Sequence, residues 1–152
     1  MKAIDFIRGL GRAVNVCDGK GVDCYYHNYD DRIGVKYYRD ERIGELTFGL
    51  QVIMNEIGLA PRCWGYSHDD KGAAYDTERV EVGYAFTWNE VQSTNMALNS
   101  TGFINDDSGG KNVGKTDDGR IVIIDFGFVK QRKDKNEYRF KINSLRDILA
   151  VY

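Results

Sequence analysis

The sequence predicts an α+β fold, in which strand-rich stretches and helices occupy separate parts of the chain. Three observations support this prediction. The chain has 152 residues, a length typical of one domain. Residues 12–38 contain β-prone runs separated by turn sequences, and residues 41–57 change to helical spacing of apolar side chains. Strands and helices then follow in groups without strict alternation, which favours α+β over alternating α/β.

The first half of the chain begins with a short predicted helix over residues 2–10, where Ile4 and Ile7 share a face. An antiparallel meander is predicted next, with hairpin turns at 18–21 and 28–31. The helix at 41–57 has Asp40 as its N-cap and Gly58 as its C-cap. Its predicted apolar face consists of Ile43, Leu46, Leu50, Ile53, Met54 and Ile57.

Strands are predicted at 62–68 and 79–86, with the polar stretch 69–78 as a loop between them. Thr87 opens a capping-box sequence with Glu90, so a helix is predicted from there to about Ser100. The remaining predicted elements are two short strands near 112–116 and 120–125 around a turn at 117–119, a strand in the Tyr-Arg-Phe-Lys-Ile run at 138–142, and a last helix after Asn143.

Composition excludes several classes of function. The formal net charge is −2, without the basic excess that a nucleic-acid interface needs. No apolar run reaches the length of a membrane span. The three cysteines are an odd number with no Cys-x-x-Cys pair, which indicates reduced thiols in the cytoplasm and neither a disulfide framework nor a zinc site.

The stretch from Gly119 to Gly127, Gly-Arg-Ile-Val-Ile-Ile-Asp-Phe-Gly, carries the strongest chemical signal. Its apolar run delivers Asp125 to the end of a buried strand, where a carboxylate on a rigid base suits a magnesium ion. Upstream, Asp107 and Asn112 have the spacing Asp-x-x-x-x-Asn, which in kinases puts a catalytic carboxylate and a metal-binding amide on one loop.

These motifs resemble the protein-kinase-like superfamily, in particular its small atypical members and the aminoglycoside-phosphotransferase type. The resemblance implies an antiparallel N-lobe sheet with one αC-type helix and a much reduced C-lobe. It implies that Asp107 is the catalytic base, and that Asn112 and Asp125 hold magnesium on the phosphates of ATP. The resemblance covers about residues 12–130, in a single minimal domain with an N-lobe at about 1–86 and a C-lobe at 87–152.

The N-terminal half resembles the family in the same order along the chain. Gly34-Val35-Lys36 resembles the strand that carries the phosphate-binding lysine, which implies that Lys36 contacts the nucleotide and pairs with Glu45 of the following helix. Gly19 and Gly21 lie where the family has its phosphate-covering glycine loop. The segment at about 81–87 corresponds to the hinge that contacts adenine.

The sequence also departs from the family pattern. Asn105 and Asp106 stand where kinases have His-Arg, and Asp106 is an alternative base if the loop register shifts by one residue. Only residues 128–152 follow the Asp-Phe-Gly motif, which is short for an acceptor platform.

Three functions therefore stay open. The chain is expected to be an ATP-dependent kinase with a protein substrate, a kinase for a small hydroxyl compound, or an inactive pseudokinase that binds or inhibits a protein. The chain resembles compact kinase-like proteins of phages and mobile elements, for which a host protein is the implied target.

A competing interpretation concerns residues 109–116, Gly-Gly-Lys-Asn-Val-Gly-Lys-Thr, which match the Walker A pattern. A Walker A loop works by opening a helix whose N-terminal amides face phosphate. Here Asp-Asp-Gly and a predicted strand follow Thr116, which leaves no room for that helix. The pattern is therefore interpreted as part of the catalytic loop and the hairpin after it.

Overall fold

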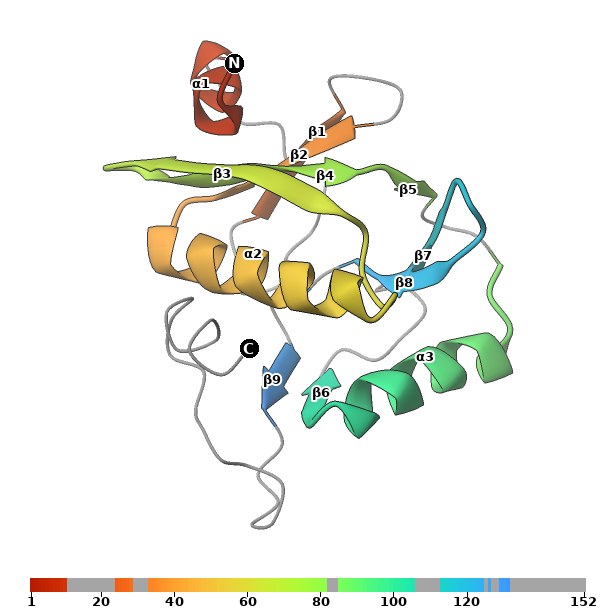
Figure 1. Ribbon diagram of the computed structural model, residues 1–152. Helices are drawn as coiled ribbons and strands as arrows, with labels where there is room; N and C mark the ends of the chain where they lie inside the picture. The colour runs from red at the N-terminus through yellow and green to blue at the C-terminus, as the bar shows by residue number, and fades with distance from the viewer. Residues whose placement is uncertain are drawn as a thin grey trace.

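The computed structural model describes residues 1–10, 24–28, 33–81, 85–105, 113–124, 126 and 129–131. These residues form three helices and nine strands (Figure 1). The helices are α1 (Ala3–Gly9), α2 (Glu41–Glu56) and α3 (Trp88–Ser100). The strands are β1 (Cys24–Asn28), β2 (Ile33–Tyr38), β3 (Cys63–Asp69), β4 (Gly72–Glu78), β5 (Val80–Glu81), β6 (Phe103–Asn105), β7 (Val113–Thr116), β8 (Ile121–Ile123) and β9 (Val129–Gln131).

The largest sheet has four strands in the order β1-β2-β4-β3, and each neighbouring pair is antiparallel. The predicted loop at 69–78 is wrong, because most of it is β4, which pairs with both β2 and β3. Ala73, Ala74 and Tyr75 are 0% exposed, so the strand is central although its C-terminal end, Asp-Thr-Glu, is polar. Within the predicted strand at 79–86, Val80–Glu81 form β5, Arg79 and residues 85–86 are not in a strand, and residues 82–84 lie outside the described part of the chain.

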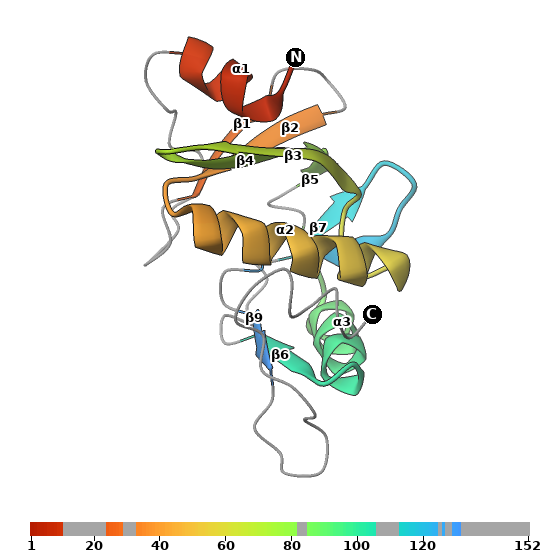
Figure 2. The same ribbon diagram turned by 60° about the vertical axis from the view of Figure 1, so that its left-hand side comes forward.

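The two faces of this sheet are covered by different helices. Figures 1 and 2 show α1 on one side and α2 on the other. Ala3, Ile4 and Ile7 of α1 pack with Val35, Tyr37 and Ala74. Tyr38 and Tyr75 point to the opposite face, as the alternation of side chains along a strand requires. The predicted first helix and its apolar face are confirmed.

Helix α2 begins and ends where its caps predict. The Asp40 carboxylate accepts hydrogen bonds from the backbone amides of Arg42, at 2.9 Å, and Ile43, at 3.3 Å. Gly58 follows the helix with φ +79°, which favours glycine. Gly44 lets α2 approach the sheet closely, since a Cβ there would lie 2.9 Å from Ala73 Cβ. The predicted apolar face is wrong at Ile57, which is 52% exposed.

Helix α3 confirms the predicted capping box. The Glu90 backbone amide donates to the Thr87 hydroxyl at 3.1 Å, and the Thr87 amide donates to the Glu90 carboxylate at 2.9 Å. The predicted hairpin is β7 and β8, which join β5 in a three-stranded sheet. The other sheet pairs β6 with β9. The predicted elements at 138–142 and after Asn143 lie outside the described residues.

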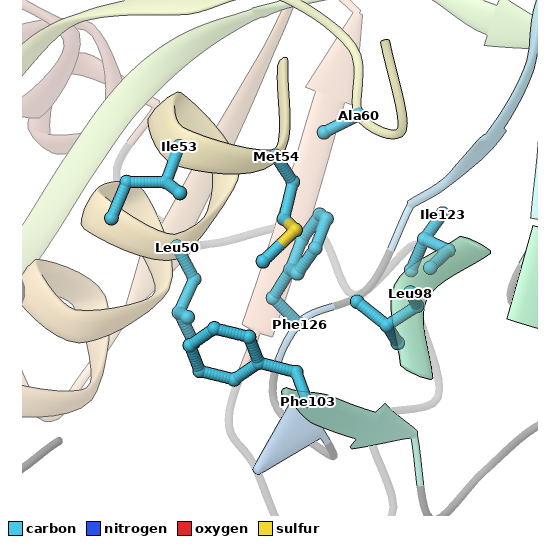
Figure 3. Packing of buried hydrophobic residues seen from close by; sticks show 8 residues of the cluster. All are labelled: Leu50, Ile53, Met54, Ala60, Leu98, Phe103, Ile123 and Phe126. Atoms are coloured by element: carbon cyan, nitrogen blue, oxygen red, sulfur yellow. The ribbon is translucent and has the colours of Figure 1, made fainter. Parts of the chain in front are cut away.

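One hydrophobic cluster joins the two halves of the chain (Figure 3). It contains residues of α2 and the segment after it, of α3, β6 and β8, and Phe126: Leu50, Ile53, Met54, Ala60, Leu98, Phe103, Ile123 and Phe126. The backbone follows the same connection, because the Ile123 amide donates to the Leu59 carbonyl at 2.8 Å. Across the ranges that the structure describes, no helix has the length and apolar character needed to cross a membrane.

Candidate functional site

Lys36 lies on β2, on the sheet face that α2 covers, and it is only 8% exposed. Its ammonium group donates to the side-chain oxygen of Gln51 at 3.4 Å and to the backbone carbonyl of Ile124. The second contact joins residues 88 positions apart. The lysine therefore connects β2, α2 and the residue that follows β8.

Gln51 provides the contact from α2, and it is 0% exposed. Its amide nitrogen donates to the Pro61 carbonyl at 3.1 Å and to the Thr77 hydroxyl oxygen at 2.9 Å. Its amide oxygen accepts from the Tyr75 hydroxyl at 3.0 Å, as well as from Lys36. Because Gln51 has two donors and two acceptor sites, this buried side chain is fully hydrogen-bonded.

The structure does not bring Glu45 to Lys36, and no ion pair joins these two described residues. Gln51 follows Glu45 by six positions, which turns its side chain roughly 120° around the helix and moves it about 9 Å along the axis. The Glu45 charge instead acts on Tyr66 of β3. The pKa of the Tyr66 phenol is raised to about 12, with burial as the largest cause and the Glu45 charge as the next.

The sequence did not predict Gln51 as the partner of Lys36, because Gln51 belongs to no recognised motif. One signal was present: Gln51 is a polar residue within the run Leu50-Gln51-Val52-Ile53-Met54. Leu50, Ile53 and Met54 on either side of it are buried. A polar side chain inside a buried helical face needs hydrogen-bond partners, so its presence in this run indicates that other polar groups contact it in the folded protein.

Ile124 connects this network to the predicted metal site through the sequence. It is the residue directly before Asp125. The predicted residues Asp106, Asp107, Asn112, Asp125, Gly19 and Gly21 lie outside the described part of the chain. The described residues hold no group of three or more His, Cys, Asp or Glu side chains suited to a metal ion.

Paired strand residues flank both segments that contain the predicted metal ligands and the predicted catalytic base. Asn105, directly before Asp106, pairs with Val129 in the β6–β9 sheet. Val113, directly after Asn112, pairs with Ile123 of β8, two positions before Asp125. The two residues that flank the segment 106–112 are therefore paired with residues that lie two positions before and two positions after the Asp-Phe-Gly motif.

Phe126 of that motif is buried in the core cluster, where Figure 3 shows its ring beside Met54 of α2. Here Phe126 packs against the same helix that provides Gln51.

The Walker A interpretation is excluded by the local structure. Lys115 and Thr116 lie on β7, which pairs with β8 on one side and β5 on the other. The Thr116 hydroxyl donates to Asp118 in the hairpin turn. A strand in this position cannot present the helix N-terminus that a P-loop needs.

The predicted hinge segment lies between β5 and α3. Val80 pairs with Thr116 and Glu81 with Lys115, and Thr87 is the N-cap of α3. Residues 82–84 lie outside the described part. Just before β5, the Glu78 carboxylate accepts from the Arg120 guanidinium at 3.2 Å and from the Arg62 amide at 3.0 Å, which ties the hairpin to the end of the large sheet.

Cys63 is a free, half-buried thiol on β3. Burial raises its pKa to about 12, with a smaller opposing effect of the Lys36 charge. Since the thiolate is the nucleophilic form, Cys63 is not a candidate nucleophile.

Neither the protein-family models nor the curated protein sequences contain a significant match to this chain. Solved structures do match. The kinase PK-1 of Cydia pomonella granulovirus aligns with a TM-score of 0.56 and 12% identity over 86% of this chain. This chain spans 59% of the length of that kinase. Monomeric WbdD aligns with a TM-score of 0.47 and 18% identity, over 71% of this chain and 33% of WbdD.

An identity this low shows the fold alone. The match to PK-1 agrees with the element order, the antiparallel sheet and the packing of α2 on one face of that sheet. The chain therefore has a protein-kinase-like α+β fold.

Proposed function

We propose that this chain binds magnesium–ATP beside Lys36 and transfers the γ-phosphoryl group to an acceptor hydroxyl. The observation that carries the proposal is the contact of the Lys36 ammonium with the Ile124 carbonyl, directly before Asp125 in the sequence. In kinases the strand lysine binds the nucleotide phosphates and the Asp of Asp-Phe-Gly binds magnesium, so a contact between Lys36 and the residue before Asp125 supports one shared nucleotide site.

The surroundings of Lys36 fit an anionic ligand. A buried charge is costly unless it is paired, yet both acceptors of Lys36 among the described residues are neutral. An ammonium group has three N–H donors, and these acceptors use two of them. A phosphate oxygen, or the Asp125 carboxylate between nucleotide-binding events, would provide the missing negative charge.

The other roles follow from the predicted site. Asn112 and Asp125 would hold magnesium, Asp107 or Asp106 would accept the proton of the acceptor hydroxyl, and Gly19 and Gly21 would cover the phosphates. Bound magnesium–ATP supplies the transferable phosphoryl group, and the protein contributes positioning and charge stabilisation. The strand pairs Asn105–Val129 and Val113–Ile123 support a common location for these segments.

Calorimetric titration with ATP and magnesium tests the nucleotide site. We expect the wild-type chain to bind, and Lys36→Met to weaken binding by about tenfold or more, because a hydrogen bond to a charged group contributes about 1.5–3 kcal/mol. Asp125→Asn should remove the magnesium dependence of binding. Lys71→Met is the matched control, since Lys71 is exposed in the turn between β3 and β4. No binding at millimolar nucleotide would contradict the proposal.

Turnover separates the two outcomes of a positive binding test. An active kinase should release ADP faster in the presence of its acceptor, and Asp107→Asn should remove that activity with nucleotide affinity retained. Binding of ATP without turnover, across protein and small hydroxyl acceptors, would instead assign the chain as a pseudokinase that acts by binding a protein partner.

A further inference from the structure

We infer that Gln51 is the residue of α2 that positions Lys36, and that α2 therefore leaves the charge of Lys36 available to an anionic ligand. This inference rests on the proposed nucleotide site and adds a positioning residue to it. The contact itself is the 3.4 Å hydrogen bond from the Lys36 ammonium to the Gln51 amide oxygen.

The orientation of the Gln51 amide is determined by its neighbours. Lys36 has only donors, so it must face the amide oxygen. The Pro61 carbonyl has only acceptor capacity, so it must face the amide nitrogen. Reversing the amide would place donor against donor and acceptor against acceptor, and only one orientation satisfies both partners.

The same neighbours select an amide over a carboxylate. Thr77 donates its hydroxyl proton to the Arg62 carbonyl at 3.2 Å, so its oxygen is an acceptor toward Gln51. A carboxylate at position 51 would face this oxygen and the Pro61 carbonyl with no proton to share. The site is therefore built for a neutral side chain, and no negative charge from α2 compensates Lys36.

The network also immobilises the lysine. Gln51 is fully buried and joins α2 to β4 through Tyr75 and Thr77, and to the segment after α2 through Pro61. Lys36 is thus held by a side chain whose own position is set by several partners, which is how a binding group is preorganised. The hydrogen bond that joins Lys36 to α2 therefore depends on the packing of this part of the core.

A double-mutant cycle tests the inference. Gln51→Leu, Lys36→Met and the combined variant are titrated with ATP and magnesium by calorimetry. We expect Gln51→Leu to weaken binding by about tenfold in the wild-type background, since it removes a hydrogen bond to a charged group. The same substitution should have no further effect in the Lys36→Met background, because Gln51 acts through Lys36. Equal effects in both backgrounds would overturn the inference.

Two further variants separate positioning from packing. Thr47→Val is the matched control, because Thr47 is buried on α2 and its hydroxyl donates to the Ile43 carbonyl of the same helix. It should leave nucleotide affinity unchanged. Tyr75→Phe removes only the hydroxyl that donates to Gln51, so it tests the network if Gln51→Leu does not fold. Its smaller loss of affinity should also disappear in the Lys36→Met background.

A measurement without nucleotide distinguishes failure of this inference from failure of the proposed function. In proton–nitrogen NMR spectra, the hydrogen-bonded and buried Lys36 ammonium should give a slowly exchanging signal that Lys36→Met removes. Gln51→Leu and Tyr75→Phe should broaden or shift that signal, and Thr47→Val should not. If the signal is unchanged in Gln51→Leu, Gln51 does not position Lys36, whether or not the protein binds ATP.

Discussion

At the scale of single residues, the main finding is a buried lysine held by a buried amide. Lys36 and Gln51 belong to elements that are adjacent in sequence, but their other hydrogen-bond partners are more distant along the chain. Gln51 is bonded to Pro61, Tyr75 and Thr77, and Lys36 is bonded to Ile124. A buried polar network of this kind is stable only when each group is hydrogen-bonded. Gln51 meets that condition.

The network predicts the effect of the closest possible change, Gln51→Glu. A carboxylate keeps the size of the side chain, but the Pro61 carbonyl and the Thr77 oxygen lose their donor. A new buried ion pair with Lys36 roughly balances its own desolvation, so the lost hydrogen bonds dominate. We expect the free energy of unfolding to fall by about 1–3 kcal/mol.

Urea unfolding at pH 7 measures this loss. Gln92→Glu on the partly exposed surface of α3 is the control and should change stability by less than about 0.5 kcal/mol. A Gln51→Glu variant as stable as the wild type would show that position 51 accepts a carboxylate.

At the scale of elements, α1 shows how a short helix is attached to the sheet. The Arg8 guanidinium makes two hydrogen bonds to the Asp69 carboxylate of β3, at 2.6 and 2.7 Å, and one to the Tyr37 hydroxyl at 3.1 Å. It also lies 5.1 Å from the centre of the Tyr37 ring. The backbone contributes through the Ile4 amide, which donates to the Ser67 hydroxyl at 3.0 Å.

The Arg8–Asp69 pair predicts a specific acid sensitivity. The hydrogen bond from Arg8 holds the pKa of Asp69 well below its ordinary value. A carboxyl group with a lowered pKa in the folded state stabilises the protein above its unfolded pKa of about 3.9, and this contribution is lost as the pH falls below that value. Because the two side chains are 34% and 31% exposed, we expect a contribution of only about 0.5–1 kcal/mol.

Asp69→Asn should therefore lower stability at pH 7 by that amount and reduce the further loss of stability below pH ~4. Urea midpoints measured between pH 7 and pH 2 test this. Asp117→Asn is the control, because Asp117 is exposed in the hairpin turn. The pair is not a stabilising contact if Asp69→Asn and wild type have the same midpoint at every pH.

At the scale of the whole molecule, one core connects the helix under the large sheet to the second half of the chain. Phe126 lies in this core with residues of α2, α3, β6 and β8 (Figure 3). Glu78 adds a polar connection between the end of β4 and Arg120 of the hairpin. The Asp-Phe-Gly motif is thereby anchored by its phenylalanine to the helix that holds Lys36.

Phe126→Ala tests how far stability depends on this connection. Removing a buried phenylalanine side chain leaves a cavity and costs about 3–5 kcal/mol. We expect a single unfolding transition at a much lower urea concentration, together with weaker nucleotide binding. Met96→Ala on the exposed surface of α3 should change stability little. A loss below about 1 kcal/mol for Phe126→Ala would mean that Phe126 does not support the core.

The sequence by itself determined the elements whose signals are local. Asp40 and Gly58 limit α2, the Thr87–Glu90 capping box begins α3, and a glycine turn joins β7 to β8. Each signal acts over a few residues, and hydrogen bonds to nearby backbone groups account for it. The order of these elements predicted the α+β class, and the resemblance of the Asp-x-x-x-x-Asn and Asp-Phe-Gly motifs to kinases implied the kinase-like fold. The structural comparison agrees with both.

Only the tertiary structure decided which polar residues are buried. Sequence favoured a loop where β4 lies, because Asp70, Lys71, Asp76, Thr77 and Glu78 gave the stretch a polar composition. It favoured Glu45 as the partner of Lys36, where the structure has Gln51. Both outcomes depend on partners distant along the chain, since β4 lies between β2 and β3 and Gln51 is hydrogen-bonded by residues up to 26 positions away. A buried polar group is tolerated only where such partners meet it, and the folded arrangement alone brings them together.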